Sequence, residues 1–67
     1  MKISTSYTSF ADMVRANPGH TVYWHYRRNV RREYAYRAAT RAVKHGLVRT
    51  ARDPRRADWT VYYPVED

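Results

Sequence analysis

Thirteen Lys and Arg against six Asp and Glu in 67 residues give the chain a formal net charge of +7, and it contains no cysteine. Its length allows one small domain over residues 1–67, and the missing cysteines exclude disulfides, thiolate metal sites and thiol nucleophiles. Because no apolar run approaches the roughly 20 residues of a membrane helix, we expect a soluble, cytoplasmic protein without a membrane partner.

The first predicted element is a helix over about residues 9–17. Phe10, Met13 and Val14 recur at the i, i+3, i+4 spacing of one helix face, and the Thr or Ser just before Phe10 can cap its start. The Asn-Pro-Gly sequence that follows disfavours helical geometry and permits a turn, so it ends the helix.

The sequence TVYWHY at residues 21–26 predicts a β-strand, because nearly all its side chains are β-branched or aromatic. Alternation would divide these side chains between the two faces of a sheet. One face would carry Val22, Trp24 and Tyr26, and the other Thr21, Tyr23 and His25.

A second helix is predicted over about residues 32–45, ended by Gly46. At 100° per residue its inner face consists of Ala35, Ala38, Ala39, Ala42 and Val43. The opposite face carries Glu33, Arg37, Thr40, Arg41 and Lys44. The small inner side chains would let the helix approach large rings closely, and Glu33 with Arg37 forms a favourable i, i+4 pair.

Two further strands are predicted at residues 47–51 and 59–64, joined by a basic turn with the Asp-Pro signal. Trp59, Val61 and Tyr63 alternate with Thr60 and Tyr62 in the last strand. The predicted fold is therefore α+β, in the order helix, strand, helix, strand, strand. Its antiparallel sheet would be packed by the Ala-rich helix, with both tryptophans beneath that helix.

Positive charge is concentrated in residues 27–56, which hold eleven Lys and Arg against only Glu33 and Asp53. A segregated basic surface is typical of a polyanion binder, since each cation that neutralises a phosphate releases condensed counterions. The alternative is an ordinary solvated surface. The candidate nucleic-acid contacts are Arg27, Arg28, Arg31, Arg32, Arg37, Thr40, Arg41, Lys44, Arg52, Arg55 and Arg56.

The stretch HGLVRTARDPRR resembles the junction between recognition helix and wing in winged helix-turn-helix regulators, especially the multiple-antibiotic-resistance type. That resemblance implies a winged-helix-like fold, with the helix of residues 32–45 in the DNA major groove. The wing would carry Arg52, Arg55 and Arg56. The family has a helix ahead of its recognition helix, where this sequence predicts a strand. The overall layout is similar to small proteins of actinobacterial phages.

We therefore expect a non-enzymatic protein that binds double-stranded DNA through phosphates, as a transcription regulator does, and that can form a homodimer. A second hypothesis is a phage-encoded protein that inhibits an acidic host protein, with Trp24 or Tyr62 as anchors. A third is an aromatic platform for single strands or RNA, formed by Tyr23, His25 and Tyr62 unless the first helix covers them.

The histidines give little indication of a metal or catalytic site. His20, His25 and His45 lack the spacing of zinc ligands, so no metal and no cofactor is expected. A metal-free ribonuclease could be assembled from His25 or His45 with Glu33, a Tyr and an Arg. Any small basic protein offers that set.

Overall fold

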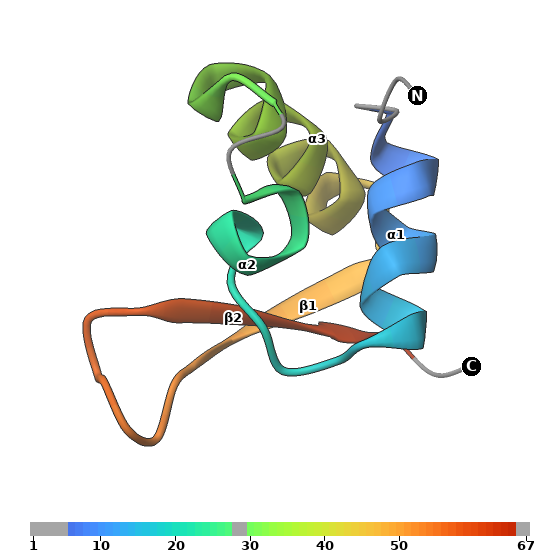
Figure 1. The fold of residues 1–67 in the computed structure, drawn as a ribbon. Coiled ribbons are helices and arrows are strands. Elements are labelled where there is room, and N and C mark those ends of the chain that lie inside the picture. Colours follow the sequence, from blue (N-terminus) through green and yellow to red (C-terminus); the bar gives the residue numbers. More distant parts are fainter. Residues whose placement is uncertain (1–5, 28–29, 66–67) are drawn as a thin grey trace.

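Three helices precede an antiparallel hairpin in the computed structural model, which describes residues 6–27 and 30–65 (Figure 1). The predicted α+β class is confirmed, whereas the predicted element order is wrong at residues 21–26, which form a helix. The elements are α1 (Tyr7–Ala16), α2 (Val22–Tyr26), α3 (Arg32–Lys44), β1 (Val48–Arg52) and β2 (Thr60–Pro64).

Helix α1 begins two residues earlier than its apolar spacing predicts, because the cap is Ser6. The Ser6 hydroxyl accepts a hydrogen bond from the backbone N–H of Ser9 at 3.2 Å, which satisfies one of the free donors of the first turn. At the other end the N–H of Asn17 donates to the carbonyl of Met13. Phe10 is fully buried on the inner face of this helix.

Helix α2 replaces the predicted strand because Thr21 caps it and because the helical period buries two of its side chains. The Thr21 hydroxyl accepts from the N–H of Trp24 at 3.1 Å. Val22 and Tyr26, four residues apart, point into the core, while Trp24 is 36% exposed. Strand alternation would have buried all three. Tertiary contacts thus override the β propensity of these aromatic residues.

Helix α3 has the predicted alanine face. Four of the five predicted residues are buried there, and Val43 is the exception at 39% exposure. The buried residues are Ala35, Ala38, Ala39 and Ala42. Their small side chains let α3 lie directly against α1, to which it packs.

The end of α3 is a Schellman motif, one residue earlier than predicted. The N–H of Leu47 donates to the carbonyl of Ala42, and the N–H of Gly46 donates to that of Val43, both at 3.0 Å. Gly46 has a φ of +71°, the left-handed conformation that glycine adopts without steric cost.

Strand β2 pairs on both of its edges. On one side it forms the hairpin with β1, in a register that sets Thr50 opposite Tyr62. On the other side the segment before α2 pairs with it, since Gly19 donates to the carbonyl of Tyr62 and Tyr62 donates to that of His20. Both predicted strands are thus confirmed, and the segment between α1 and α2 is tied to the sheet.

The face of β2 that packs into the core carries Tyr62, whereas Trp59 belongs to the opposite face. Tyr62 is 8% exposed and meets the edge of the Phe10 ring at 5.2 Å between centroids. Trp59 is 45% exposed. The predicted placement of both tryptophans under α3 is therefore wrong. Val61, on the opposite face of the strand from Tyr62, is also buried but does not join this core.

This assignment of the two faces predicts opposite stability effects for two ring truncations in β2. Tyr62→Ala should lower the free energy of unfolding by roughly 3 kcal/mol, because it leaves a cavity beside Phe10. Trp59→Ala should cost less than about 1 kcal/mol, although it removes the larger ring, because that ring is at the surface. Urea unfolding followed by circular dichroism measures both. The reverse ranking would contradict the observed face.

Candidate functional site

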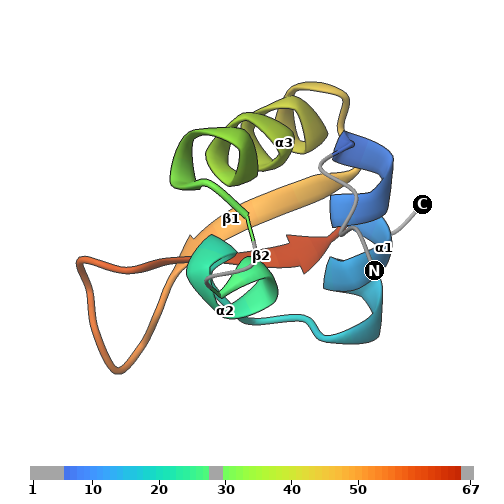
Figure 2. The same ribbon diagram turned by 45° about the horizontal axis from the view of Figure 1, so that its top comes forward.

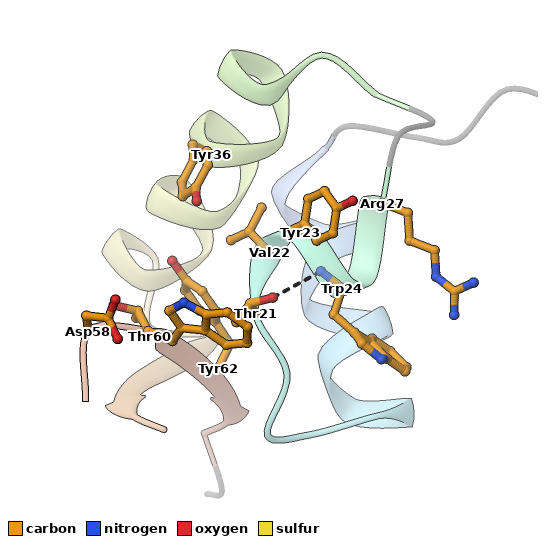
Figure 3. A pocket seen from close by; sticks show the side chains of 10 residues that line it. Thr21, Val22, Tyr23, Trp24, Arg27, Tyr36, Asp58, Thr60 and Tyr62 are labelled. Atoms are coloured by element: carbon orange, nitrogen blue, oxygen red, sulfur yellow. Dashed lines mark hydrogen bonds between the residues drawn. The ribbon is translucent and has the colours of Figure 1, made fainter. Parts of the chain in front are cut away.

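The predicted contact residues are exposed wherever the structure describes them, and they lie on three elements. Arg28 lies outside the described residues. Arg37, Thr40, Arg41 and Lys44 occupy the outer face of α3, opposite its alanine face. The others lie outside that face: Arg27 ends α2 with its side chain pointing away from α3 (Figure 3), Arg31 and Arg32 begin α3, and Arg52, Arg55 and Arg56 belong to the hairpin.

The positive charge of this surface is not neutralised within the described residues. Across residues 6–27 and 30–65 the one ion pair joins Arg15 to Asp12 on α1, at 2.7 Å between Nη1 and Oδ1. The predicted pair between Glu33 and Arg37 does not form. The Arg37 guanidinium lies instead over the ring of Tyr34, 5.8 Å from its centroid. The cations of α3 and the hairpin therefore remain available to an anionic partner.

The hairpin loop holds its arginines in a defined turn. The Asp53 carboxylate accepts from the N–H of Arg55 at 2.8 Å, and its carbonyl accepts from the N–H of Arg56 at 3.2 Å. Such a side-chain-closed turn is what the predicted Asp-Pro signal implies. The loop projects beyond the helices at the end of the molecule remote from α1 in both views (Figures 1 and 2).

Among the described residues, four further arginine side chains stack on exposed or half-buried rings, and these contacts were not predicted from the sequence. The distances from guanidinium carbon to ring centroid lie between 4.5 and 5.8 Å. The pairs are Arg27 with Trp24, Arg32 with Tyr36, Arg49 with Tyr63 and Arg56 with Trp59. The first two pairs join residues three or four apart on or at the end of a helix. This spacing is the feature of the sequence that could have predicted their contact. Arg49, absent from the predicted set, is exposed on β1.

A groove of about 1020 Å³ lies between the start of α2, the middle of α3 and the hairpin (Figure 3). Five of its ten lining residues are aromatic, Asp58 provides a carboxylate and Arg27 a guanidinium. The aromatic residues are Tyr23, Trp24, Tyr36, Trp59 and Tyr62.

Coverage by the first helix, the alternative to an open platform of Tyr23, His25 and Tyr62, is observed for two of these three rings. Tyr62 is packed against Phe10, and His25 is half-buried with its ring edge-on to Phe10. Tyr23 remains 61% exposed.

The titration of His25 is shifted by its position under α1. Burial lowers the pKa of His25, and the charge of nearby His20 lowers it further. Its Nε2 atom and the hydroxyl of Tyr26 are buried without a hydrogen-bond partner. Burial also raises the pKa of Tyr62, with a smaller contribution from Tyr36.

The three histidines take part in ring contacts rather than in a common cluster. His20 stacks on Trp24 at 3.6 Å between centroids, and His45 stacks on Tyr7 at 4.3 Å. Within residues 6–27 and 30–65 no three His, Asp or Glu side chains converge as a metal site requires.

Comparison with known proteins returns no protein-family model, no curated protein and no solved structure that matches this chain. In the part of the chain that the structure describes, no helix has the length and apolar character needed to cross a membrane. The function of the basic surface and of the groove must therefore be inferred from their own geometry.

The lowered pKa of His25 predicts a loss of stability in mild acid. The unfolded chain binds a proton near the ordinary value of 6.5, whereas the folded chain binds it only at lower pH. The contribution of His25 to stability is therefore fully present above pH 6.5 and is lost as the pH drops from there toward the pKa of the folded state. His25→Phe should flatten this decline, measured as the urea midpoint at pH 7.5 and 5.5.

Val14→Ala is the control for that measurement, because it truncates a buried side chain of α1 without removing a titrating group. It should lower the midpoint by a similar amount at both pH values. An unchanged pH dependence in His25→Phe would contradict the assignment.

Proposed function

We propose that this protein is a winged helix-turn-helix protein that binds double-stranded DNA. Support comes first from the order of its elements: three helices, then a hairpin, with the segment before α2 paired to β2. Helix α2 packs on α3, and the short link of residues 27–31 joins them. A helix-turn-helix followed by a β-hairpin wing has this arrangement.

Helix α2 lies where the winged-helix family has a helix and where the sequence predicted a strand, so its presence supports the resemblance. It takes the position of the helix that supports a recognition helix, although it is only five residues long. Arg27, which ends it, has a φ of +53°, a conformation rare outside glycine. A strained residue retained at a turn is typical of functional positions, and here its guanidinium is exposed.

The observation that carries the proposal is the row of unneutralised cations on α3 and on the hairpin loop. Arg37, Arg41 and Lys44 would face the groove of the duplex, and Arg55 and Arg56 would reach the adjacent phosphates from the wing. Each cation that replaces a condensed counterion adds affinity that depends on salt. Self-repulsion among these cations also makes an anionic partner favourable.

Sequence-specific recognition of bases should be limited, because few side chains on the outer face of α3 can form directional hydrogen bonds with base edges. Thr40 carries a hydroxyl on that face, and the cations around it suit phosphates. Affinity is thus expected to exceed sequence specificity.

A second candidate function, binding an acidic protein, is favoured by the exposed rings beside the cations. Trp24 and Trp59 are 36% and 45% exposed, and such rings anchor protein interfaces. Trp24 was a predicted anchor for this role. This hypothesis predicts no retardation of a duplex and the capture of one acidic protein from a lysate.

A charge reversal on α3 should weaken duplex binding and its salt dependence. We expect Arg41→Glu to reduce the slope of log affinity against log salt by about 0.9, the value for one phosphate contact. Affinity at a fixed low salt should fall roughly tenfold, as for loss of one charge-assisted hydrogen bond. A mobility-shift titration of a mixed-sequence duplex at two salt concentrations measures both effects.

Arg15→Glu is the matched control, since it makes the same change in net charge on α1, whose contact with α3 is on the alanine side. Its duplex affinity should stay within about twofold of the parent, because a change on α1 acts on DNA bound at the outer face of α3 only through long-range, screened charge. Equal losses in the two variants would mean that net charge alone, not the face of α3, governs binding.

A further inference from the structure

The aromatic groove beside α3 has a chemistry that intact duplex DNA does not use. A base pair in a stacked duplex presents only its edges to a protein, whereas this groove is lined by aromatic rings. Tyr23 and Trp24 line it from α2, Tyr36 from α3 and Trp59 from the hairpin. Figure 3 shows Tyr36 and Tyr62 on the side of α3 and the hairpin, whereas the Trp24 side chain points away from them. Apart from Tyr62, these rings are exposed, although a small domain normally buries its large apolar side chains, and an exposed apolar patch is typical of a binding site.

A guanidinium lies against three of these groove rings. The carbon of the Arg56 guanidinium is 4.5 Å from the Trp59 centroid, that of Arg32 is 5.4 Å from Tyr36, and that of Arg27 is 5.8 Å from Trp24. None of the three arginines has an ion pair among the described residues. Of these arginines Arg27 lines the groove itself, and Arg32 and Arg56 lie against rings that line it, so positive charge accompanies its aromatic walls. An unpaired nucleotide has the complementary parts, a planar base and a phosphate.

We propose that this groove binds an unpaired nucleobase of DNA, so that the protein prefers a duplex carrying an unpaired nucleotide over an intact one. The inference rests on the proposed function, because α3 and the hairpin would hold the flanking duplex. A volume of about 1020 Å³ is at the upper end of the range for drug-sized ligands, and so it accommodates a nucleotide.

The preference follows from the energetics of exposing a base. Stacking on an aromatic side chain stabilises any base through its π-face. Extruding a paired base opposes that gain, and the opposition is smallest where the base is already unpaired. Asp58, the carboxylate in the groove, can accept a hydrogen bond from the amino group of adenine, cytosine or guanine. It repels phosphate, which the arginines beside the groove attract.

The charge of the arginines beside the groove argues against a second copy of this chain as the occupant. A chain with a net charge of +7 would bring its own cations against Arg27, Arg32 and Arg56. Charge complementarity instead points to a polyanion, and the ring faces point to bases within it.

The test compares three labelled DNA ligands at one salt concentration: an intact duplex, the same duplex with a single unpaired adenine, and the single strand. The protein should bind the duplex with the unpaired adenine roughly tenfold more tightly than the intact duplex. Both tryptophans of the chain line the groove, so intrinsic fluorescence reports on it directly. Quenching should accompany binding of the unpaired adenine and be weak with the intact duplex.

Two tyrosines of α3 provide a matched pair of variants. Tyr36 and Tyr34 are 44% and 45% exposed, and each carries a stacked arginine, but of the two only Tyr36 lines the groove. Tyr36→Ala should reduce the tenfold preference to about twofold or less and leave intact-duplex affinity within twofold. Tyr34→Ala should keep the preference. Trp59→Ala should behave like Tyr36→Ala, and circular dichroism checks that all three remain folded.

The possible results separate the two proposals. Equal affinity for the intact and the interrupted duplex, or equal effects of Tyr36→Ala and Tyr34→Ala, would overturn the groove assignment and leave duplex binding standing. Binding to the single strand with no retardation of either duplex would overturn both. A fourth ligand, the RNA form of the duplex with the unpaired adenine, tests the choice of DNA. Tighter binding to this RNA than to the DNA form would overturn that choice.

Discussion

The Phe10 ring is the contact on which the arrangement of this protein depends. Fully buried on α1, it meets Tyr26 of α2 at 5.9 Å, lies edge-on to His25, and meets Tyr62 of β2 at 5.2 Å. One side chain thus joins the first helix to the second helix and to the sheet. Because α1 also lies on the alanine face of α3, the positions of all the helices relative to the hairpin follow from packing around this ring.

This core divides the aromatic residues of the chain into two groups. Phe10, Tyr26 and Tyr62 are buried and supply the large rings that a short chain requires. Tyr23, Trp24, Tyr36 and Trp59 remain partly exposed around the groove, three of them beneath arginines. The second group adds little to the core, and its exposure is the basis of the proposed role of the groove. The same packing that orients α2 therefore also builds the candidate site.

The charge of the basic residues and the backbone of Arg27 both act against the stability of the fold. Cations on α3 and the hairpin repel one another and have no acidic partner among the described residues, which lowers the stability of the folded state. Arg27 adds a strained backbone conformation at the end of α2. Closely packed alanines, the Schellman motif at Gly46 and the two-sided pairing of β2 offset these costs. A polyanion would relieve the repulsion and so stabilise the fold.

Local patterns in the sequence determined α1, α3, the hairpin and the exposure of the basic residues. Periodicity, the glycine at residue 46 and the Asp-Pro turn act within a few residues, so their effects can be inferred without the rest of the chain. Only the tertiary structure decided that residues 21–26 form α2, and that Tyr62 rather than Trp59 enters the core. Both choices depend on Phe10, which is distant in sequence. The composition of residues 21–26 is compatible with a strand or with a helix, and either face of β2 could have been buried. Only contact with another element selects between these alternatives.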